Sequence, residues 1–132
     1  MSQTLKAGLT ATRRVEIDRD RTISFMGDDC RVYSTPNLLY DIEMASRDLL
    51  LANIEAGKDS VGTRIELDHV GATLMGMWVE ITVTLAEVNG GAVSFDFTAR
   101  DAVEEVARGK HKRVIVGVEK TAQRLQAKRA KS

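Results

Sequence analysis

The most regular hydrophobic pattern of the chain runs from Pro36 to Ala56 and predicts one long helix. Apolar side chains recur there at steps of three and four residues, which is the spacing of one buried helical face. These side chains are Leu38, Ile42, Ala45, Leu49 and Ala52. The apolar face is widened further by Leu39, Leu50 and Leu51. Because a surface helix has a narrower apolar stripe, we expect other elements to enclose this one.

Both ends of this helix carry residues that are typical of helix boundaries. Thr35 is the predicted N-cap, since a threonine hydroxyl can accept a hydrogen bond from a free N–H of the first turn. Pro36 suits the first helical position because its missing N–H would be unpaired there anyway. Gly57 is the predicted stop. The helix is therefore expected to fill the interval between Thr35 and Gly57.

Strict alternation of apolar and polar residues predicts a hairpin of two strands. Between Trp78 and Val88 the apolar side chains of Val79, Ile81, Val83 and Leu85 alternate with polar ones, as in a half-exposed strand. Asn89-Gly90-Gly91 is typical of a tight hairpin turn, and a second alternating segment follows it. The side chains expected to face the core are Val79, Ile81, Val83, Leu85, Val93, Phe95, Phe97 and Ala99.

Weaker patterns predict the remaining strands. Leu9 to Ile17 alternates loosely and predicts a first strand, which Thr22 to Phe25 either continues or pairs with. Thr63 to Leu67 predicts a short strand, and Val106 to Val118 predicts the last one. One or two strands, a long helix and three or four antiparallel strands are the order of an α+β fold, in which the sheet can curl round the helix.

Length, composition and charge describe one ordinary globular domain. The chain has 132 residues, 43% of them hydrophobic and 29% charged. Nineteen basic residues balance nineteen acidic ones, so no global field favours nucleic acid or an anionic membrane as a partner. The single cysteine, Cys30, excludes a disulfide within the chain and favours a reducing compartment. With neither an apolar signal segment nor a membrane span, we expect a cytoplasmic protein.

The basic C-terminal segment is expected to lie outside the folded domain. We assign residues 1–120 to the domain and residues 121–132 to a tail. From Lys120 to Ser132 the chain has five basic residues and no acidic one, so it is either a short frayed helix or disordered.

Two residues of the predicted helix are candidates for chemistry. The hydroxyl of Thr35 either only caps the helix or also holds or attacks a substrate carbonyl at the positively polarised helix start. Glu43 lies among leucines on the helix, where partial desolvation would suit a base or a nucleophile. The alternative is a structural ion pair between Glu43 and Arg47, four residues later.

The two histidines and the basic cluster of the last strand are weaker candidates. His69 precedes Gly71 and Ala72, whose small size would let a ligand approach the backbone, although a lone histidine is more often structural. We expect His111, between two lysines, to be exposed and uncommitted. The basic cluster either binds a phosphate-bearing ligand or is a solvated strand face. Its members are Arg108, Lys110, Lys112 and Arg113.

Motifs of several common site classes are missing from the sequence. Two distant histidines and one cysteine do not have the spacing of a zinc site, so no metal is expected. The sequence also lacks a Walker loop, a dinucleotide fingerprint and a G-x-S-x-G elbow, and we expect no cofactor.

Taken together, three segments resemble the hot-dog-fold thioesterases, and most closely the fluoroacetyl-CoA thioesterase branch. In S-T-P-N-L-L-Y-D-I-E-M-A, Thr35 stands eight residues before Glu43, as in that branch. G-T-R-I-E-L-D-H-V-G-A-T-L-M-G resembles the histidine segment of the branch, and G-K-H-K-R-V-I-V resembles its arginine-bearing strand. The resemblance extends from about Tyr33 to Val118. Each motif alone is weak evidence for the family, but the ordered set of three is specific.

The resemblance implies a fold, an assembly and a set of site residues. The hot-dog fold has one long central helix wrapped by a curved antiparallel sheet of about five strands. The family implies a homodimer, or a dimer of dimers, with active sites at the interface. By carry-over, Thr35, Glu43 and His69 are catalytic, and Gly62 and Arg113 bind the substrate, Arg113 meeting the coenzyme A moiety.

One departure from the branch concerns acyl specificity. The stretch before Thr35 is shorter here and lacks the phenylalanine-bearing lid of the branch, with Phe25 and Tyr33 as the only aromatic residues nearby. The resemblance therefore predicts hydrolysis of a short or medium acyl-CoA thioester rather than of fluoroacetyl-CoA in particular.

The mechanism and two other functions stay open at this stage. Glu43 attacks the carbonyl or activates water, Thr35 orients or relays, and His69 stabilises charge or protonates the leaving thiolate. A hot-dog enoyl-CoA hydratase or dehydratase is disfavoured because the helix start, T-P-N, lacks a histidine. A non-catalytic acyl-CoA-binding module would bind the thioester without turnover.

Overall fold

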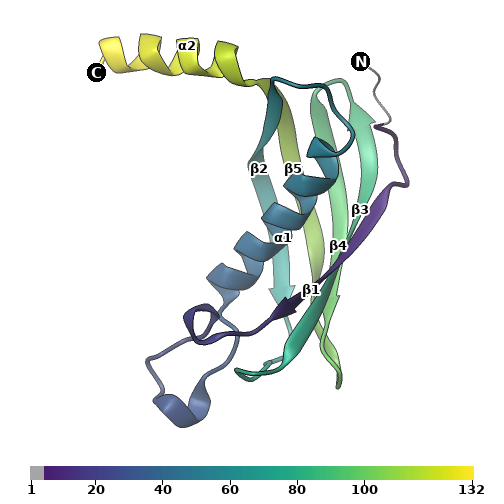
Figure 1. Ribbon diagram of the computed structural model, residues 1–132, viewed down its shortest axis with the longest axis vertical. Coiled ribbons are helices and arrows are strands. Elements are labelled where there is room, and N and C mark those ends of the chain that lie inside the picture. The colour runs from purple at the N-terminus through teal and green to yellow at the C-terminus, as the bar shows by residue number, and fades with distance from the viewer. Residues whose placement is uncertain (1–4) are drawn as a thin grey trace.

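The chain folds into one curved antiparallel sheet with a long helix across one face, as the computed structural model of Figure 1 shows for residues 5–132. The strands and α-helices are β1 (Thr10–Glu16), α1 (Thr35–Leu51), β2 (Lys58–His69), β3 (Trp78–Asn89), β4 (Ala92–Arg100), β5 (Glu105–Gly117) and α2 (Val118–Ala130). The strand order is β1-β3-β4-β5-β2, so β1 and β2 are the two edges. The predicted α+β class and five-strand sheet are confirmed. Residues 1–4, with which the predicted domain begins, lie outside the described residues.

The core lies between α1 and the sheet, and the hairpin of β3 and β4 supplies much of it. All eight alternating side chains predicted to face inward are at most 2% exposed. Gly90 takes the positive φ of 64° that the tight turn after Asn89 requires. From α1, Leu38, Ile42 and Leu50 reach the same core and are completely buried. Apolar periodicity thus predicted both layers of the fold correctly.

The helix is shorter than its sequence pattern predicted. It ends at Leu51, and Ala52, predicted on the buried face, is exposed. The side-chain amide of Asn53 donates to the carbonyl of Leu49 over 2.8 Å and satisfies one of the free acceptors of the last turn. Gly57, with a φ of 86°, lies in the turn before β2 and is not the helix stop.

Two of the weaker strand predictions need correction. β2 has twelve residues and is much longer than the predicted Thr63–Leu67, because a register shift between Gly62 and Arg64 interrupts its alternation. The segment from Thr22 to Phe25 is no strand, and only an isolated bridge joins Thr22 to Tyr33. The predicted first and last strands agree with β1 and β5 within one residue or two.

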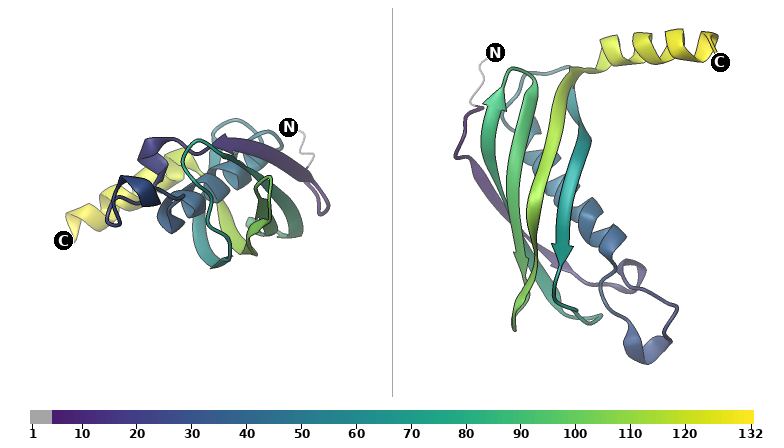
Figure 2. Two further views of the ribbon diagram at one scale, coloured as in Figure 1. Left: turned by 90° about the horizontal axis from the view of Figure 1, so that it is seen from below. Right: turned by 180° about the vertical axis from the view of Figure 1, so that it is seen from behind.

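The basic tail forms the helix α2, which leaves the end of β5 and projects away from the sheet (Figures 1 and 2). None of its residues is buried. Its direction takes it past the edge at which β2 lies, opposite to the edge formed by β1. Within the described part of the chain, no helix has the length and apolarity that a membrane crossing requires.

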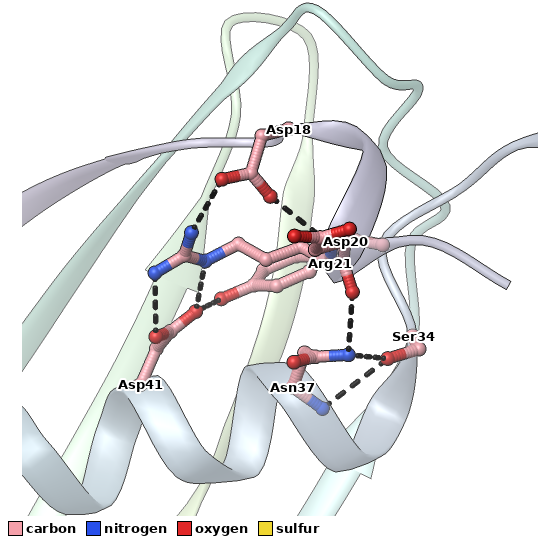
Figure 3. Close-up of polar contacts among 7 residues, drawn as sticks. Asp18, Asp20, Arg21, Ser34, Asn37 and Asp41 are labelled. Atoms are coloured by element: carbon pink, nitrogen blue, oxygen red, sulfur yellow. Dashed lines mark hydrogen bonds and ion pairs between the residues drawn. The ribbon is translucent and has the colours of Figure 1, made fainter.

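A network of charged and polar side chains fastens the loop before α1 to the helix (Figure 3). The guanidinium of Arg21 donates to both carboxylate oxygens of Asp41, over 2.8 and 3.1 Å, and to Asp18 over 3.0 Å. The hydroxyl of Tyr33 donates to Asp41 over 2.6 Å. Burial and this hydrogen bond raise the pKa of Tyr33, and the bond to Asp41 raises the pKa of Arg21. The network holds the first turns of α1 in place.

Candidate active site

The helix start positions Thr35 for contact with β2, because a neighbouring residue supplies the cap. Ser34, not Thr35, is the N-cap, and its hydroxyl accepts hydrogen bonds from the backbone N–H of Asn37 over 3.2 Å and from its side-chain amide over 2.6 Å. Thr35 is the first helical residue, and its Oγ1 lies 2.7 Å from Nδ1 of His69. The capping role predicted for Thr35 is therefore wrong, and its hydroxyl is committed to the histidine.

His69 ends β2 and borders a shallow groove. The groove has a volume of about 290 Å³ and is lined, besides His69, by Val32, Tyr33, Val70, Gly71 and Ala72. Burial lowers the pKa of His69. Among the described residues, Nε2 of His69 is buried and has no hydrogen-bond partner. The ring therefore has one nitrogen bonded to Thr35 and one left for another group.

Glu43 lies on α1 at a second position, facing the middle of β2 and β5. Its side chain is 28% exposed, and its Oε2 is 3.5 Å from Nη1 of Arg113 and 3.9 Å from Nε2 of His111. Arg47, the predicted structural partner, instead donates two hydrogen bonds to Asp59, over 2.8 and 2.7 Å. The prediction of a structural ion pair between Glu43 and Arg47 is thus wrong. The carboxylate of Glu43 is held by a buried cation and still has access to solvent.

Gly62 leaves the space that the Glu43 carboxylate occupies. A Cβ at this position would overlap Oε2 of Glu43 and would lie 3.1 Å from Cε1 of His111. Gly62 pairs with Arg113 across β2 and β5, just before the register shift of β2. The absence of a side chain therefore lets the helix carboxylate come directly against the strand backbone.

We expect Gly62→Ala to lower kcat/KM by about 100-fold for a reaction in which the Glu43 carboxylate takes part, because a displacement of catalytic groups by about 1 Å can have that effect. The added methyl group must push the Glu43 carboxylate aside. Gly117→Ala is a suitable control, since its φ is −78° and no atom lies within 4 Å of the added Cβ. Steady-state kinetics of both variants provide the measurement. Equal activity of the two would contradict the assigned position of Glu43.

Arg113 and His111 are both buried behind Glu43. Arg113 is 3% exposed and donates from Nε to Oγ of Ser60 over 2.7 Å and from Nη2 to the carbonyl of Ser60 over 2.9 Å. His111 is 1% exposed, so the prediction of an exposed, uncommitted histidine is wrong. Burial lowers the pKa of both His111 and Arg113.

The basic cluster of β5 is divided between the two faces of the sheet. Lys110 and Lys112 are exposed on the face opposite to His111 and Arg113, and Lys110 is paired with Asp96 over 2.9 Å. Side chains of successive strand residues point to opposite faces, so Arg113 cannot form one patch with the other three members of the cluster, Arg108, Lys110 and Lys112. Strict use of the alternation would have predicted His111 and Arg113 on the inner face together.

Within one chain, the predicted catalytic residues form two separate groups. Thr35 and His69 meet at one end of β2, and Glu43 meets Gly62 and Arg113 further along the strand. Seven residues of strand from Gly62 to His69 correspond to about 23 Å, and eight residues of helix from Thr35 to Glu43 to about 12 Å. In residues 5–132, no hydrogen bond or ion pair joins the two groups, and no cluster of His, Cys, Asp or Glu could hold a metal.

Comparisons with known proteins match the segment of the chain that carries these residues, and they agree with its fold. A family model described as "Fluoroacetyl-CoA-specific thioesterase" matches residues 17–119. The fluoroacetyl-CoA thioesterase of Streptantibioticus cattleyicolor is 33% identical over 89 residues, which are 67% of this chain and 64% of that protein. The matched segment therefore spans slightly less than two thirds of this relative.

Solved structures show the same architecture over nearly the whole chain. A crystal structure of a point mutant of the fluoroacetyl-CoA-specific thioesterase has a TM-score of 0.88 and 25% identity, with 96% of this chain and 99% of that chain covered. A thioesterase superfamily member from Thermus thermophilus has a TM-score of 0.83 and 22% identity, with coverages of 96% and 97%. A hot-dog-like protein from Thermanaerovibrio acidaminovorans has a TM-score of 0.84 and 24% identity, with coverages of 92% and 91%. The predicted hot-dog fold is confirmed.

Proposed function

This chain belongs to the fluoroacetyl-CoA-specific thioesterase family, and from this premise we propose that it hydrolyses a short or medium acyl-CoA thioester to the free acid and coenzyme A. The observation that carries the proposal is the environment of Glu43. Its carboxylate is partly exposed, lies against the buried cation of Arg113, and occupies the space above Gly62. A carboxylate held in this way can act on an incoming thioester without a metal.

The proposed reaction replaces the C–S bond of the thioester by a C–O bond. Either Glu43 removes a proton from water, whose oxygen attacks the carbonyl carbon, or Glu43 attacks that carbon itself and water then hydrolyses the acyl-enzyme. In both routes the C–S electron pair leaves with the coenzyme A thiolate, which takes up a proton. Thr35 and His69 are the proposed group for orienting the substrate and for stabilising or protonating the leaving sulfur.

The substrate-binding roles proposed for Gly62 and Arg113 concern the reacting end of the substrate. Both residues adjoin Glu43, and the Arg113 guanidinium is almost fully buried. This arrangement supports a contact near the thioester carbonyl and acyl group. A contact between Arg113 and a more distant part of coenzyme A stays a prediction.

We also propose a homodimer, or a dimer of dimers, in which a second chain completes each site. The separation of Glu43 from Thr35 and His69 in one chain supports this assembly, since the reacting groups of one thioester must lie close together. The edge position of β2 supports it too, because this strand has a free side for pairing with another strand. We propose the cytoplasm as the compartment, on the argument from the single cysteine.

The acyl group need not be fluoroacetyl. Phe25 is 81% exposed in the loop before α1, and Tyr33 is buried with its hydroxyl bonded to Asp41. We therefore propose a substrate range among short and medium acyl chains, to be defined by measurement.

Release of coenzyme A from acetyl-, fluoroacetyl-, butyryl- and octanoyl-CoA tests the proposal. We expect saturable hydrolysis of at least one thioester, and we expect Thr35→Ala to lower kcat by about tenfold or more, because it removes the hydrogen-bond partner of His69. Thr35→Ser keeps the hydroxyl and is the matched control. Activity that survives both Thr35→Ala and Glu43→Ala would refute the proposed site.

The same assay separates the two other functions. Binding of acyl-CoA without release of coenzyme A would identify a non-catalytic binding module. Hydration of an enoyl-CoA would identify a hydratase, and the loss of absorbance of the conjugated double bond measures this reaction. No contact among the described residues favours either function over hydrolysis.

A further inference from the structure

His111 has no role in the proposed reaction and is nevertheless one of the most completely buried polar residues of the chain. It lies on the inner face of β5, is 1% exposed, and stacks on Phe95 of β4 at a centroid distance of 6.4 Å and an interplanar angle of 27°. Both of its ring nitrogens have hydrogen-bond partners, one on β2 and one on β5. A buried histidine with two defined hydrogen bonds has a fixed orientation.

The partners of His111 determine its tautomer. Nδ1 lies 2.8 Å from the carbonyl oxygen of Arg64, which can only accept, so Nδ1 carries the proton. Nε2 lies 3.1 Å from Nη1 of Arg113, and a guanidinium can only donate, so Nε2 contributes its lone pair. His111 is therefore neutral and accepts a hydrogen bond from the buried arginine.

The guanidinium of Arg113 is held at all three of its nitrogens. Nε and Nη2 donate to Ser60 on β2, and Nη1 donates to His111. Nη1 is also the atom that lies 3.5 Å from Oε2 of Glu43. The nitrogen that His111 fixes is thus the one that faces the catalytic carboxylate.

The charges around His111 favour its neutral form. Burial lowers the pKa of His111, and the positive charge of Arg113 acts in the same direction. Glu43, on α1, acts in the opposite direction, as does the hydrogen bond to the carbonyl of Arg64 on β2. A protonated ring would turn an N–H towards Arg113 and would place two cations in contact.

We propose that His111 is a positioning residue that, by accepting a hydrogen bond from Nη1 of Arg113, holds the guanidinium against Glu43 and so orients the catalytic carboxylate. This inference rests on the proposed function. Nε2 of His111 is 3.9 Å from Oε2 of Glu43, which is beyond hydrogen-bond distance, so His111 acts on this carboxylate through Arg113. Ser60 holds the other side of the same guanidinium.

Two substitutions of His111 separate this role from simple filling of the core. The amide of glutamine reaches the position of Nε2 and can accept from Arg113, whereas the shorter asparagine amide reaches only the position of Nδ1 and bonds to Arg64. We expect His111→Asn to lower kcat by about tenfold or more with KM within about twofold, and His111→Gln to retain kcat within about threefold. Thermal unfolding of both variants reports any common loss of stability.

A double-mutant cycle with Arg113→Met tests whether His111 acts through Arg113. We expect His111→Asn to have no further effect on kcat once Arg113 is methionine, because the hydrogen bond it removes is already gone. Ser60→Ala removes the hydroxyl that holds Nε and should lower kcat in the same manner, which provides a second test if His111→Asn does not fold.

The outcomes distinguish this inference from the proposed function. If the wild-type protein releases coenzyme A, equal losses of kcat in His111→Asn and His111→Gln would overturn the positioning role alone. An undiminished effect of His111→Asn in the Arg113→Met background would also overturn it. If the wild-type protein hydrolyses no thioester, the proposed function fails, and the inference fails with it.

Discussion

Glu43→Gln is expected to lower kcat for acyl-CoA hydrolysis by roughly 100- to 10,000-fold, the usual contribution of a positioned general base or a lost nucleophile. Glutamine has nearly the same shape and can still fill the space above Gly62, but its amide can neither take a proton nor attack a carbonyl. KM should change little, because the carboxylate is assigned to the chemical step. Initial rates of coenzyme A release over a range of substrate concentrations give both constants.

Glu55→Gln is the matched control for this experiment. Glu55 is a half-exposed glutamate that pairs with Lys58 over 3.2 Å in the turn after α1, and the same substitution there should leave kcat unchanged. A Glu43→Gln enzyme that keeps more than about a tenth of the wild-type kcat would exclude both roles of Glu43. Detection of an acyl adduct on Glu43 by mass spectrometry after rapid quenching would select the nucleophilic route over the general-base route.

Asp41→Asn is expected to lower the free energy of unfolding by about 2–4 kcal/mol, which is the largest stability effect that we predict for a single polar side chain. Asp41 accepts hydrogen bonds from Arg21 and from Tyr33, and the asparagine amide cannot accept at both oxygens. The loss removes the buried counter-charge of the Arg21 guanidinium and leaves it paired with the more exposed carboxylate of Asp18. Urea unfolding, monitored by circular dichroism, measures the change.

Asp48→Asn provides the comparison on the same helix. Asp48 pairs with Arg13 of β1, but the two side chains are 49% and 39% exposed, so its substitution should cost at most about 1 kcal/mol. Similar losses in the two variants would show that burial does not govern the strength of the Arg21–Asp41 pair. The network also holds the first turns of α1, so Asp41→Asn is further expected to weaken the Thr35–His69 contact.

The outline of the fold was predictable because it follows from local patterns. The alternation from Trp78 to Val88 and after Gly91 identified every buried side chain of the hairpin, since the strand period is two and one face is buried. The apolar steps of three and four likewise identified the helix. Its end was misjudged because an asparagine side chain, Asn53, bonds to the last turn before the expected glycine is reached.

The residues of the candidate site come from the sequence, but their hydrogen-bond and ion-pair partners do not. Thr35, Glu43 and His69 were singled out from their neighbours in sequence and from a family resemblance. Their pairing was not: Arg47 bonds to Asp59, and Ser34 supplies the helix cap. The expectation that His111 is exposed is wrong because alternate strand residues face opposite sides, so Lys110 and Lys112 do not share the environment of His111.

The sequence by itself determined the sheet and helix, the residues of the core, and the segments that carry the candidate site. Only the tertiary structure decided which polar groups meet: Thr35 with His69, and Glu43 with Gly62, His111 and Arg113. The physical reason is the range of the forces involved. Periodicity records which side of an element is buried, whereas a hydrogen bond or an ion pair depends on a partner from a distant segment, whose position is set by the packing of the whole core.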